Sequence, residues 1–297
     1  MDVKAINEKF DLRKTGGVMA GLLYSGEGGI LSSHWHEELE IVYTLSGGGG
    51  LHYINGTCYD ADERELLVIN SNFVHSVIPR SGTAGIGDPA VLVMIIDMQF
   101  LKCNFPSYDR FYFTNSDRAV NEEIAALLNE IRSCAEQFEP GCADILHRNA
   151  LILELLSQLS RTRIISRSEI DCSGSLKEIE RIKKIVEFIE AHYAEPLTRE
   201  AVAKHFYLNS TYFSSYFKKY AGQTFTQYLT NYRLEKASRM LIQSDDQIGE
   251  IALKCGFSDH RSFISAFKKR FEDTPSRYRK MIEKSDKSEK QADIYGR

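Results

Sequence analysis

Short apolar runs alternate with glycine and polar turn residues through the first hundred positions of the chain. Many short runs at even spacing are typical of strands in a β-barrel or jelly roll. Asn55-Gly56 separates two of these runs and indicates a tight hairpin, because both turn positions require positive φ. The pattern therefore predicts a β domain whose strands include Val18–Tyr24, Glu40–Leu45, Leu51–Ile54, Leu66–Ile69 and Val91–Ile96.

Between residues 118 and 165 the hydrophobic spacing changes to the period of amphipathic helices. The two apolar stripes are Ile124, Leu127, Leu128 and Ile131, and then Leu151, Leu155, Leu156 and Leu159. Pro140-Gly141 separates them. Since a stripe does not identify its own partner, these helices either cover the β domain or pair with a second subunit.

Residues 166–178 are polar and rich in serine and glycine, as in a flexible linker. Helical patterning resumes at Ile179 and continues to about residue 283, and a charged tail at 284–297 is expected to be flexible. We therefore expect a domain at 1–165, a linker at 166–178 and a second domain at 179–283.

The second domain contains an internal repeat. The segment from Phe213 to Lys219 returns at Phe263 to Lys269, at an offset of 50 residues, whereas Ala203 corresponds to Ala252 at an offset of 49. The second copy has therefore gained one residue between its two helices. In each copy, phenylalanines recur on one side of a helix and lysines follow on the other, which predicts two helix–turn–helix units.

The expected caps and exposed faces follow from the same pattern. Thr198 precedes the first helix of the first unit, Ser210 its second helix, and Ser258 or Asp259 the second helix of the second unit. A recognition helix enters the major groove by its first turns, so its early exposed residues meet base edges and later lysines meet phosphates. The residues expected to face DNA are Thr211, Ser214, Ser215, Lys218, Lys219, His260, Arg261, Ser262, Ser265, Lys268 and Lys269.

Charge separates the two halves. Residues 1–177 carry 15 Lys and Arg against 24 Asp and Glu, a net charge of −9, whereas residues 178–284 carry 19 against 14, a net charge of +5. An acidic half joined to a basic half is expected when one half alone meets phosphate.

If both recognition helices dock on one face of DNA, they should lie roughly 34 Å apart.

Six scattered cysteines form no Cys-x-x-Cys pair, which argues against a zinc ribbon and a disulfide framework. The N-terminus has no apolar core or cleavage site, and the longest apolar run, Val91–Ile96, is too short to span a bilayer. These features predict a cytoplasmic protein without a membrane association.

The second domain resembles the DNA-binding domain of AraC/XylS-type transcription regulators over about residues 180–281. The resemblance is carried by Gly256-Phe257-Ser258-Asp259, Phe263, Phe267-Lys268-Lys269, Thr274-Pro275-Ser276 and Tyr278-Arg279. It implies a seven-helix domain with two helix–turn–helix units. One departure is Tyr207, which stands where Gly256 stands in the second unit. Because residues with a Cβ tolerate a left-handed turn poorly, we expect the first turn to adopt another geometry.

Three histidines and a glutamate form a second group of candidate functional residues, in the N-terminal domain. His34 and His36 are spaced to share one face of a strand, Glu40 has the same parity, and His75 follows a buried strand. Three imidazoles and a carboxylate suit a divalent transition metal.

The spacing of Gly28, His34, His36, Glu40 and Gly47 resembles the first cupin motif. Arg64, Asn70 and Asn72 depart from the second cupin motif, and His75 is kept. Cupin-like sensor domains are the usual N-terminal half of one large branch of AraC-type regulators, which implies that His34, His36, Glu40 and His75 line an effector pocket. A metal site, a metal- or redox-sensing regulator, satisfied core histidines and a metal-dependent cupin enzyme are the alternatives.

The resulting prediction is an α+β two-domain protein: an N-terminal cupin-like β-barrel with flanking helices and a C-terminal all-α double helix–turn–helix domain. It is expected to be a regulator and not an enzyme, without a cofactor. Its expected partners are promoter DNA, a small-molecule effector such as a sugar or glycoside, RNA polymerase and a second copy of the chain.

Overall fold

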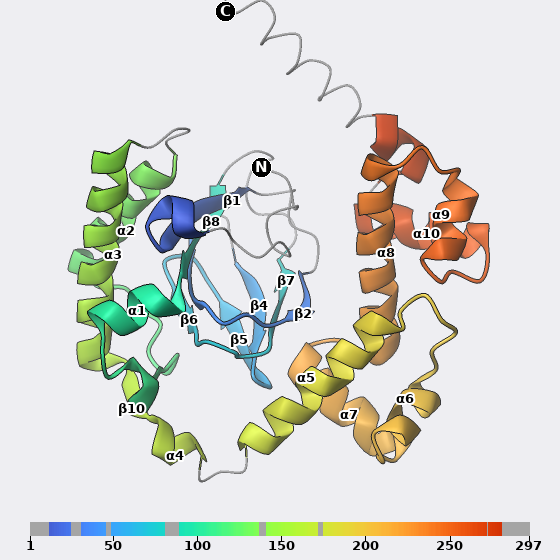
Figure 1. Ribbon diagram of the computed structural model, residues 1–297, viewed down its shortest axis with the longest axis horizontal. Helices are drawn as coiled ribbons and strands as arrows, with labels where there is room; N and C mark the ends of the chain where they lie inside the picture. The colour runs from blue at the N-terminus through green and yellow to red at the C-terminus, as the bar shows by residue number, and fades with distance from the viewer. Residues whose placement is uncertain are drawn as a thin grey trace, which may run out of the picture. The chain divides into compact units, whose positions relative to one another are not determined.

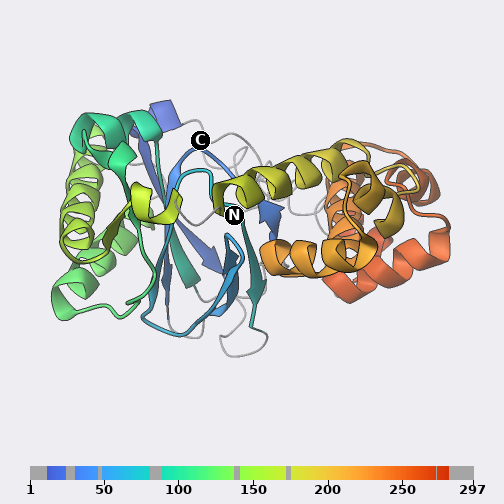
Figure 2. The same cartoon turned by 90° about the horizontal axis from the view of Figure 1, so that it is seen from below.

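The computed structural model describes residues 12–24, 31–45, 49–80, 89–136, 141–171, 175–271 and 273–280 (Figures 1 and 2). The chain divides into two compact units, Met1–Ile182 and Lys183–Arg297. Gly28, Gly47, the N-terminal segment and the tail at 284–297 lie outside the described residues. No helix in the described ranges is long and apolar enough to cross a membrane.

The N-terminal unit contains two four-stranded antiparallel sheets. The first has the order β1-β8-β3-β6 and the second the order β2-β7-β4-β5. Their strands are β1 (Val18–Tyr24), β2 (Leu31–His34), β3 (Leu39–Thr44), β4 (Gly50–Ile54), β5 (Thr57–Ala61), β6 (Leu66–Ile69), β7 (His75–Pro79) and β8 (Pro89–Ile96). The two-domain α+β class is confirmed, and no ladder among the described residues joins these two sheets into a closed barrel.

The hairpin predicted at Asn55-Gly56 is confirmed. These residues connect β4 to β5 with φ values of 47° and 82°, as a tight hairpin turn of right-handed twist requires. The hairpin fixes the register in which His52 pairs with Tyr59.

Both faces of the first sheet are buried along β3 and β6. On one face Ile41, Val68 and Met94 join a core with the helices, and on the other Val42 and Leu67 join a smaller cluster with residues of the second sheet. Continuous burial of β6 explains why this strand reads as an unbroken apolar run.

Helices α2 (Glu122–Ala135) and α3 (Cys142–Thr162) lie along one side of the first sheet in both views (Figures 1 and 2). Ile124, Leu128, Ile131, Leu155 and Leu159 are buried in the core that these helices share with β1, β3, β6 and β8. The apolar stripes are therefore used within the subunit, which favours core cover over a subunit interface for these side chains. The same unit contains α1 (Met98–Asn104) and the short 3₁₀ helices at Leu12–Thr15 and Tyr108–Arg110.

Two asparagine side chains join β6 and the residue after it to residues 113–115, which lie beside them. The Asn70 amide accepts from Phe113 N and donates to Phe113 O, both at 2.8 Å. The Asn115 amide accepts from Val68 N at 2.8 Å and donates to Val68 O at 2.9 Å. Each amide thus supplies the donor and acceptor pair that a neighbouring strand would supply. We call these four hydrogen bonds the asparagine clamp.

The asparagine clamp includes a residue of β9, which belongs to the last β-ladder of the N-terminal unit. Phe113 lies in β9 (Phe111–Phe113), which pairs with β10 (Ile164–Ser166). Helix α4 (Arg167–Asp171) follows β10 directly, and α5 (Ser175–Ala191) begins four residues later. The range 166–178, whose composition is typical of a flexible linker, therefore contains regular structure that the composition did not indicate.

The C-terminal unit is built on one long helix, α8 (Phe225–Gln243). In Figure 1 it runs between two helical pairs, α6 (Arg199–His205) with α7 (Ser210–Ala221), and α9 (Ile248–Lys254) with α10 (His260–Phe271). Its first half packs aromatic rings against α7, with Phe217 and Tyr228 centroids 5.4 Å apart. Its second half packs Leu234 and Leu241 against α9 and α10. With α5 and the helical residues 275–280, the described part of this domain contains the seven helices implied by the family resemblance.

Candidate functional site

The first candidate recognition helix, α7, begins at Ser210. Asn209 is its N-cap, because the Asn209 side chain accepts from Tyr212 N at 2.8 Å. The prediction of Ser210 as the cap was wrong by one residue, since Ser210 already has helical backbone geometry. Phe213 and Phe217 are fully buried. Thr211, Ser215, Lys218 and Lys219 are exposed, and Ser214 is half-buried.

The second candidate recognition helix, α10, follows Asp259. The Asp259 carboxylate accepts from Ser262 N at 2.8 Å, so Asp259 is the cap, one of the two residues predicted. Phe263 and Phe267 are fully buried. The residues predicted to face DNA are all exposed on this helix: His260, Arg261, Ser262, Ser265, Lys268 and Lys269.

Three of the serine hydroxyl groups on these faces already donate to the backbone. Ser214 Oγ donates to Ser210 O at 2.8 Å, Ser215 Oγ to Tyr212 O at 3.0 Å, and Ser262 Oγ to Asp259 O at 2.9 Å. Each oxygen keeps acceptor capacity. These serines are therefore suited to accept from base amino groups, whereas Arg261 is suited to donate to guanine.

The two turns share one geometry, and the prediction that they would differ was wrong. Tyr207 has φ of 55° and Gly256 has φ of 81°, both left-handed. Tyr207 N donates to Lys204 O and Gly256 N to Leu253 O, at 3.1 and 2.9 Å, so the same backbone bond closes each turn. The residue gained in the second copy is Ser258, which lies between the turn and the cap.

Within the N-terminal unit, the structure brings together the four predicted sensor residues, which we call the histidine cluster: His34, His36, Glu40 and His75. One potential ligand atom from each lies within 4.8 Å of the others. His34 ends β2 and pairs with His75 on β7. His36 lies beyond the end of β2, so its predicted place on the strand was wrong. The chain after His34 nevertheless returns the His36 ring to 5.1 Å from that of His75.

Glu40 is the acceptor at the centre of the cluster. His36 Nε2 lies 3.0 Å from Glu40 Oε2, and His75 Nε2 lies 3.2 Å from the same oxygen. Burial favours the protonated carboxyl, but the two histidines outweigh it and hold the pKa of Glu40 well below its usual range. Burial likewise opposes the charged form of His36, yet the hydrogen bond to Glu40 and its charge raise the pKa of His36. The pair is thus stabilised as imidazolium and carboxylate.

His52 is a further polar residue of this region that the sequence reasoning missed. It is 3% exposed, and its Nδ1 has no hydrogen-bond partner among the residues that the structure describes. Burial lowers the pKa of His52 to about 4, because neighbouring Glu40 only partly compensates and His75 opposes a second positive charge. His52 and buried Ile54 are two positions apart on β4, and this period of two would have predicted that His52 is buried as well.

The free energy of unfolding of the N-terminal domain is expected to fall by about 2 kcal/mol between pH 6.5 and about pH 5 because of His52. In this range the unfolded histidine, with its ordinary pKa of 6.5, binds a proton that the folded histidine, with a pKa of about 4, does not. The raised pKa of His36 changes the free energy of unfolding above this pH range, and the lowered pKa of Glu40 changes it below this range. Denaturant titrations in EDTA can follow Trp35, the single tryptophan. His52→Leu should remove this share of the pH dependence, and equal slopes for both proteins would contradict the assignment.

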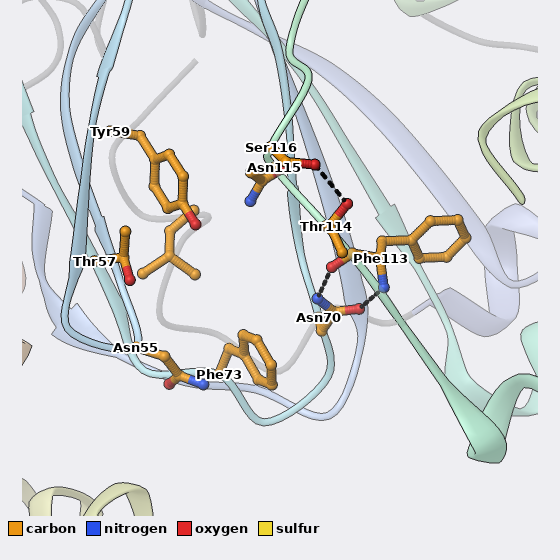
Figure 3. Close-up of a pocket in the computed structure, with 10 residues that line it drawn as sticks. Asn55, Thr57, Tyr59, Asn70, Phe73, Phe113, Thr114, Asn115 and Ser116 are labelled. Atoms are coloured by element: carbon orange, nitrogen blue, oxygen red, sulfur yellow. Dashed lines mark hydrogen bonds between the residues drawn. The ribbon is translucent and has the colours of Figure 1, made fainter. Parts of the chain in front are cut away.

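A pocket of about 340 Å³ lies in the same N-terminal unit (Figure 3). Figure 3 shows Thr57 and Tyr59 of β5 on one side and Asn115 and Ser116 on the other. The pocket is lined by neutral residues: Ile54, Asn55, Thr57, Tyr59, Asn70, Phe73, Phe113, Thr114, Asn115 and Ser116. Ile54 is the cross-strand neighbour of His75, so the pocket and the histidine cluster adjoin along the β4–β7 ladder. Its volume is at the lower end of the range for small-molecule sites, roughly 300–1,000 Å³.

Two helix–turn–helix units and a β domain with a buried polar site define a DNA-binding regulator with a sensor domain. Comparison with known families agrees: residues 29–156 match the AraC-like ligand binding domain, and residues 202–281 match a helix-turn-helix domain. Together these matches cover more than half of the chain, which belongs to the AraC-type transcription regulators.

Curated relatives share both domains. The chain is 25% identical to the uncharacterized transcriptional regulator YdeC of Bacillus subtilis, over 85% of this chain and 87% of that protein. It is 26% identical to the transcriptional activator RhaS of Escherichia fergusonii, over 84% and 88%. Among solved structures, the DNA-binding domain of AdpA in complex with a target DNA is 26% identical, covering 34% of this chain and 90% of that one, with a TM-score of 0.33.

Proposed function

We propose that the exposed faces of α7 and α10 read one promoter site, with Arg261 as the main base contact. The observation that carries this proposal is the exposure of matching positions on the two helices over matching buried phenylalanines. On α7 these positions are Thr211, Ser214, Ser215, Lys218 and Lys219, and on α10 His260, Arg261, Ser262, Ser265, Lys268 and Lys269. Arg261 follows the first residue of its helix, where a recognition helix meets base edges.

Arg261→Ala is expected to cost about 1–3 kcal/mol of binding to the preferred site and to relax base preference at one position. The site can be selected by the wild-type protein from a random DNA library. Lys268→Ala is the matched control on the same helix face. It should weaken binding to all sequences alike and lower the salt slope by about 0.9. Unchanged base preference in Arg261→Ala would contradict the role of Arg261.

The histidine cluster and the adjoining pocket form the proposed effector site. Its neutral amide, hydroxyl and aromatic lining suits an uncharged, hydroxyl-bearing molecule such as a sugar or glycoside, and the cluster offers a buried carboxylate as acceptor. Such a molecule would shift the balance between DNA-binding arrangements of the protein. A screen of neutral sugars by thermal unfolding tests this, because a ligand of the folded state raises the unfolding midpoint.

A divalent transition metal is the second candidate ligand. His36 Nδ1 lies 3.1 Å from Glu38 O and His75 Nδ1 lies 2.9 Å from Phe73 O, so both rings can hold their Nε2 atoms toward the cluster. Metal-ligating histidines are commonly oriented in this way. Ligand atoms across a zinc site lie about 4 Å apart at most, so the present spread of 4.8 Å would have to contract slightly.

Metal analysis of the purified protein distinguishes the two ligands. We expect no stoichiometric metal, in wild type or in His34→Ala, if the cluster serves an organic effector. His147→Ala is the control, since His147 lies on α3 and its side chain is 61% exposed. Stoichiometric metal that is lost in His34→Ala and kept in His147→Ala would overturn the effector assignment and favour metal sensing, or a metal-dependent activity.

The remaining parts of the proposal concern the setting of the protein. We propose that it acts in the cytoplasm as a homodimer and contacts RNA polymerase at the promoter. The buried stripes of α2 and α3 are used within the subunit, so a dimer would have to use other surfaces. A monomeric mass at micromolar concentration by light scattering would count against the dimer.

A further inference from the structure

Tyr207 combines three properties that the fold alone does not require. It is a bulky residue in a left-handed turn, with φ of 55°. Its side chain is 97% exposed, so it adds nothing to the hydrophobic core. It is located between α6 and α7, two residues before the Asn209 cap of the first recognition helix. Backbone strain without a packing gain points to a role outside the folding of the chain.

The corresponding residue of the second unit shows what packing demands. A Cβ on Gly256 would lie 2.8 Å from both Tyr193 O and Ala194 O, so that turn is closed against backbone and admits glycine only. At the first turn the equivalent Tyr207 side chain extends into solvent. The two turns therefore share one backbone geometry, but only the first turn can place a side chain in solvent for a partner to contact.

The chemistry around Tyr207 favours an anionic partner. The exposed Lys204 lies one turn earlier at the end of α6, and Tyr207 N donates to its carbonyl. Lys218 and Lys219 follow on α7. A phenolic hydroxyl is one of the neutral donors that proteins use toward DNA phosphate oxygens. The end of a recognition helix that enters the major groove also brings the preceding turn close to the phosphate backbone.

We propose that Tyr207 donates its hydroxyl to a phosphate of the DNA backbone and so positions the first recognition helix. This role rests on the proposed docking of α7 and α10 on DNA. It is a positioning contact without base preference, and it compensates for a first helix face made mostly of small hydroxyls.

Tyr207→Phe removes the hydroxyl alone, and Tyr207→Gly removes the side chain while keeping the left-handed turn. We expect Tyr207→Phe to weaken binding about fivefold to tenfold on a library-selected duplex and on a mixed-sequence duplex alike. The salt slope should not change, because the donor is neutral. Lys218→Ala, in contrast, should lower the slope by about 0.9. The denaturation midpoint of Tyr207→Phe should match that of wild type, since the hydroxyl is exposed.

Wild-type affinity of Tyr207→Phe on both duplexes would overturn the phosphate contact, whatever the affinity of Tyr207→Gly. Unchanged DNA binding with reduced transcription from a cognate promoter would also overturn it, and would assign Tyr207 to a protein partner. If Lys218→Ala and Lys268→Ala also bind as wild type does, the docking of these helices on DNA is itself wrong, which is a separate failure.

Discussion

Gly256→Ala is expected to lower the free energy of unfolding of the C-terminal domain by about 2–4 kcal/mol and to abolish specific DNA binding. Two costs combine at this position. A left-handed φ of 81° disfavours any residue with a Cβ, and the added carbon would lie 2.8 Å from two backbone oxygens. Neither oxygen is the end of a flexible side chain, so the strain cannot be released by a rotamer change.

The effect on DNA binding follows from what those oxygens hold. Tyr193 O also accepts from Arg233 Nε at 2.7 Å, and Arg233 belongs to α8, the helix shared by both units. The turn at Gly256 therefore rests on the same segment that α8 fixes. Moving it would change the direction of α10 relative to α7 and prevent both helices from docking on one site.

Urea titrations followed by helical circular dichroism and binding to the selected duplex would measure these effects. Tyr207→Ala is the matched control, because its backbone is equally left-handed and its surroundings are open. It should change the denaturation midpoint little. Equal midpoints for Gly256→Ala and Tyr207→Ala would show that the close approach at Gly256 carries no energetic weight.

Asn115→Leu is expected to destabilise the N-terminal domain by about 4 kcal/mol. Leucine has the same branched arrangement of side-chain heavy atoms but leaves Val68 N and Val68 O without partners, and Val68 is fully buried. Each unsatisfied buried backbone group costs about 1–3 kcal/mol. Denaturant titration followed by Trp35 fluorescence is the measurement.

Asn104→Leu is the control for this prediction. Asn104 also donates to a backbone oxygen, Phe100 O, but it is exposed, so water can replace the lost bond. A cost of less than about 1 kcal/mol for both variants would mean that water reaches β6 and that the asparagine clamp contributes little.

The features that the sequence predicted correctly depend on local patterns. Hydrophobic period and turn residues indicated β1, β3, β4, β6 and β8, the Asn55-Gly56 hairpin, α2 and α3, because each is set by neighbours within a few positions. The internal repeat identified the second helix of each helix–turn–helix unit, α7 and α10, since matched phenylalanines mark the buried side of each helix and leave the other side exposed. The histidine cluster was predicted from the parity of His34, His36 and Glu40 and from cupin-like spacing, although β2 ends at His34 and Glu40 lies on β3.

The features that were missed depend on contacts between distant residues. In the sequence, Asn70 looks like a departure from the second cupin motif, and Asn115 looks like a loop residue. Their role appears only when β6 meets a segment more than 40 positions away. Tyr207 was expected to avoid a left-handed turn because propensity disfavours it, yet the backbone bonds of the turn impose it. Helix α4 was missed because polar composition does not show that β9 anchors the preceding strand.

The asparagine clamp also has a consequence for self-association. The outward backbone groups of β6 are all occupied: Leu66 N donates to Arg118 O, Leu66 O accepts from Arg163, and Asn115 bonds both groups of Val68. A strand in this state offers a second polypeptide no edge on which to add a strand. A chain that lost Asn115 would expose a run of four apolar residues, Leu66–Ile69, together with unpaired backbone. Its first visible defect would then be aggregation through intermolecular β-pairing, before any loss of DNA recognition.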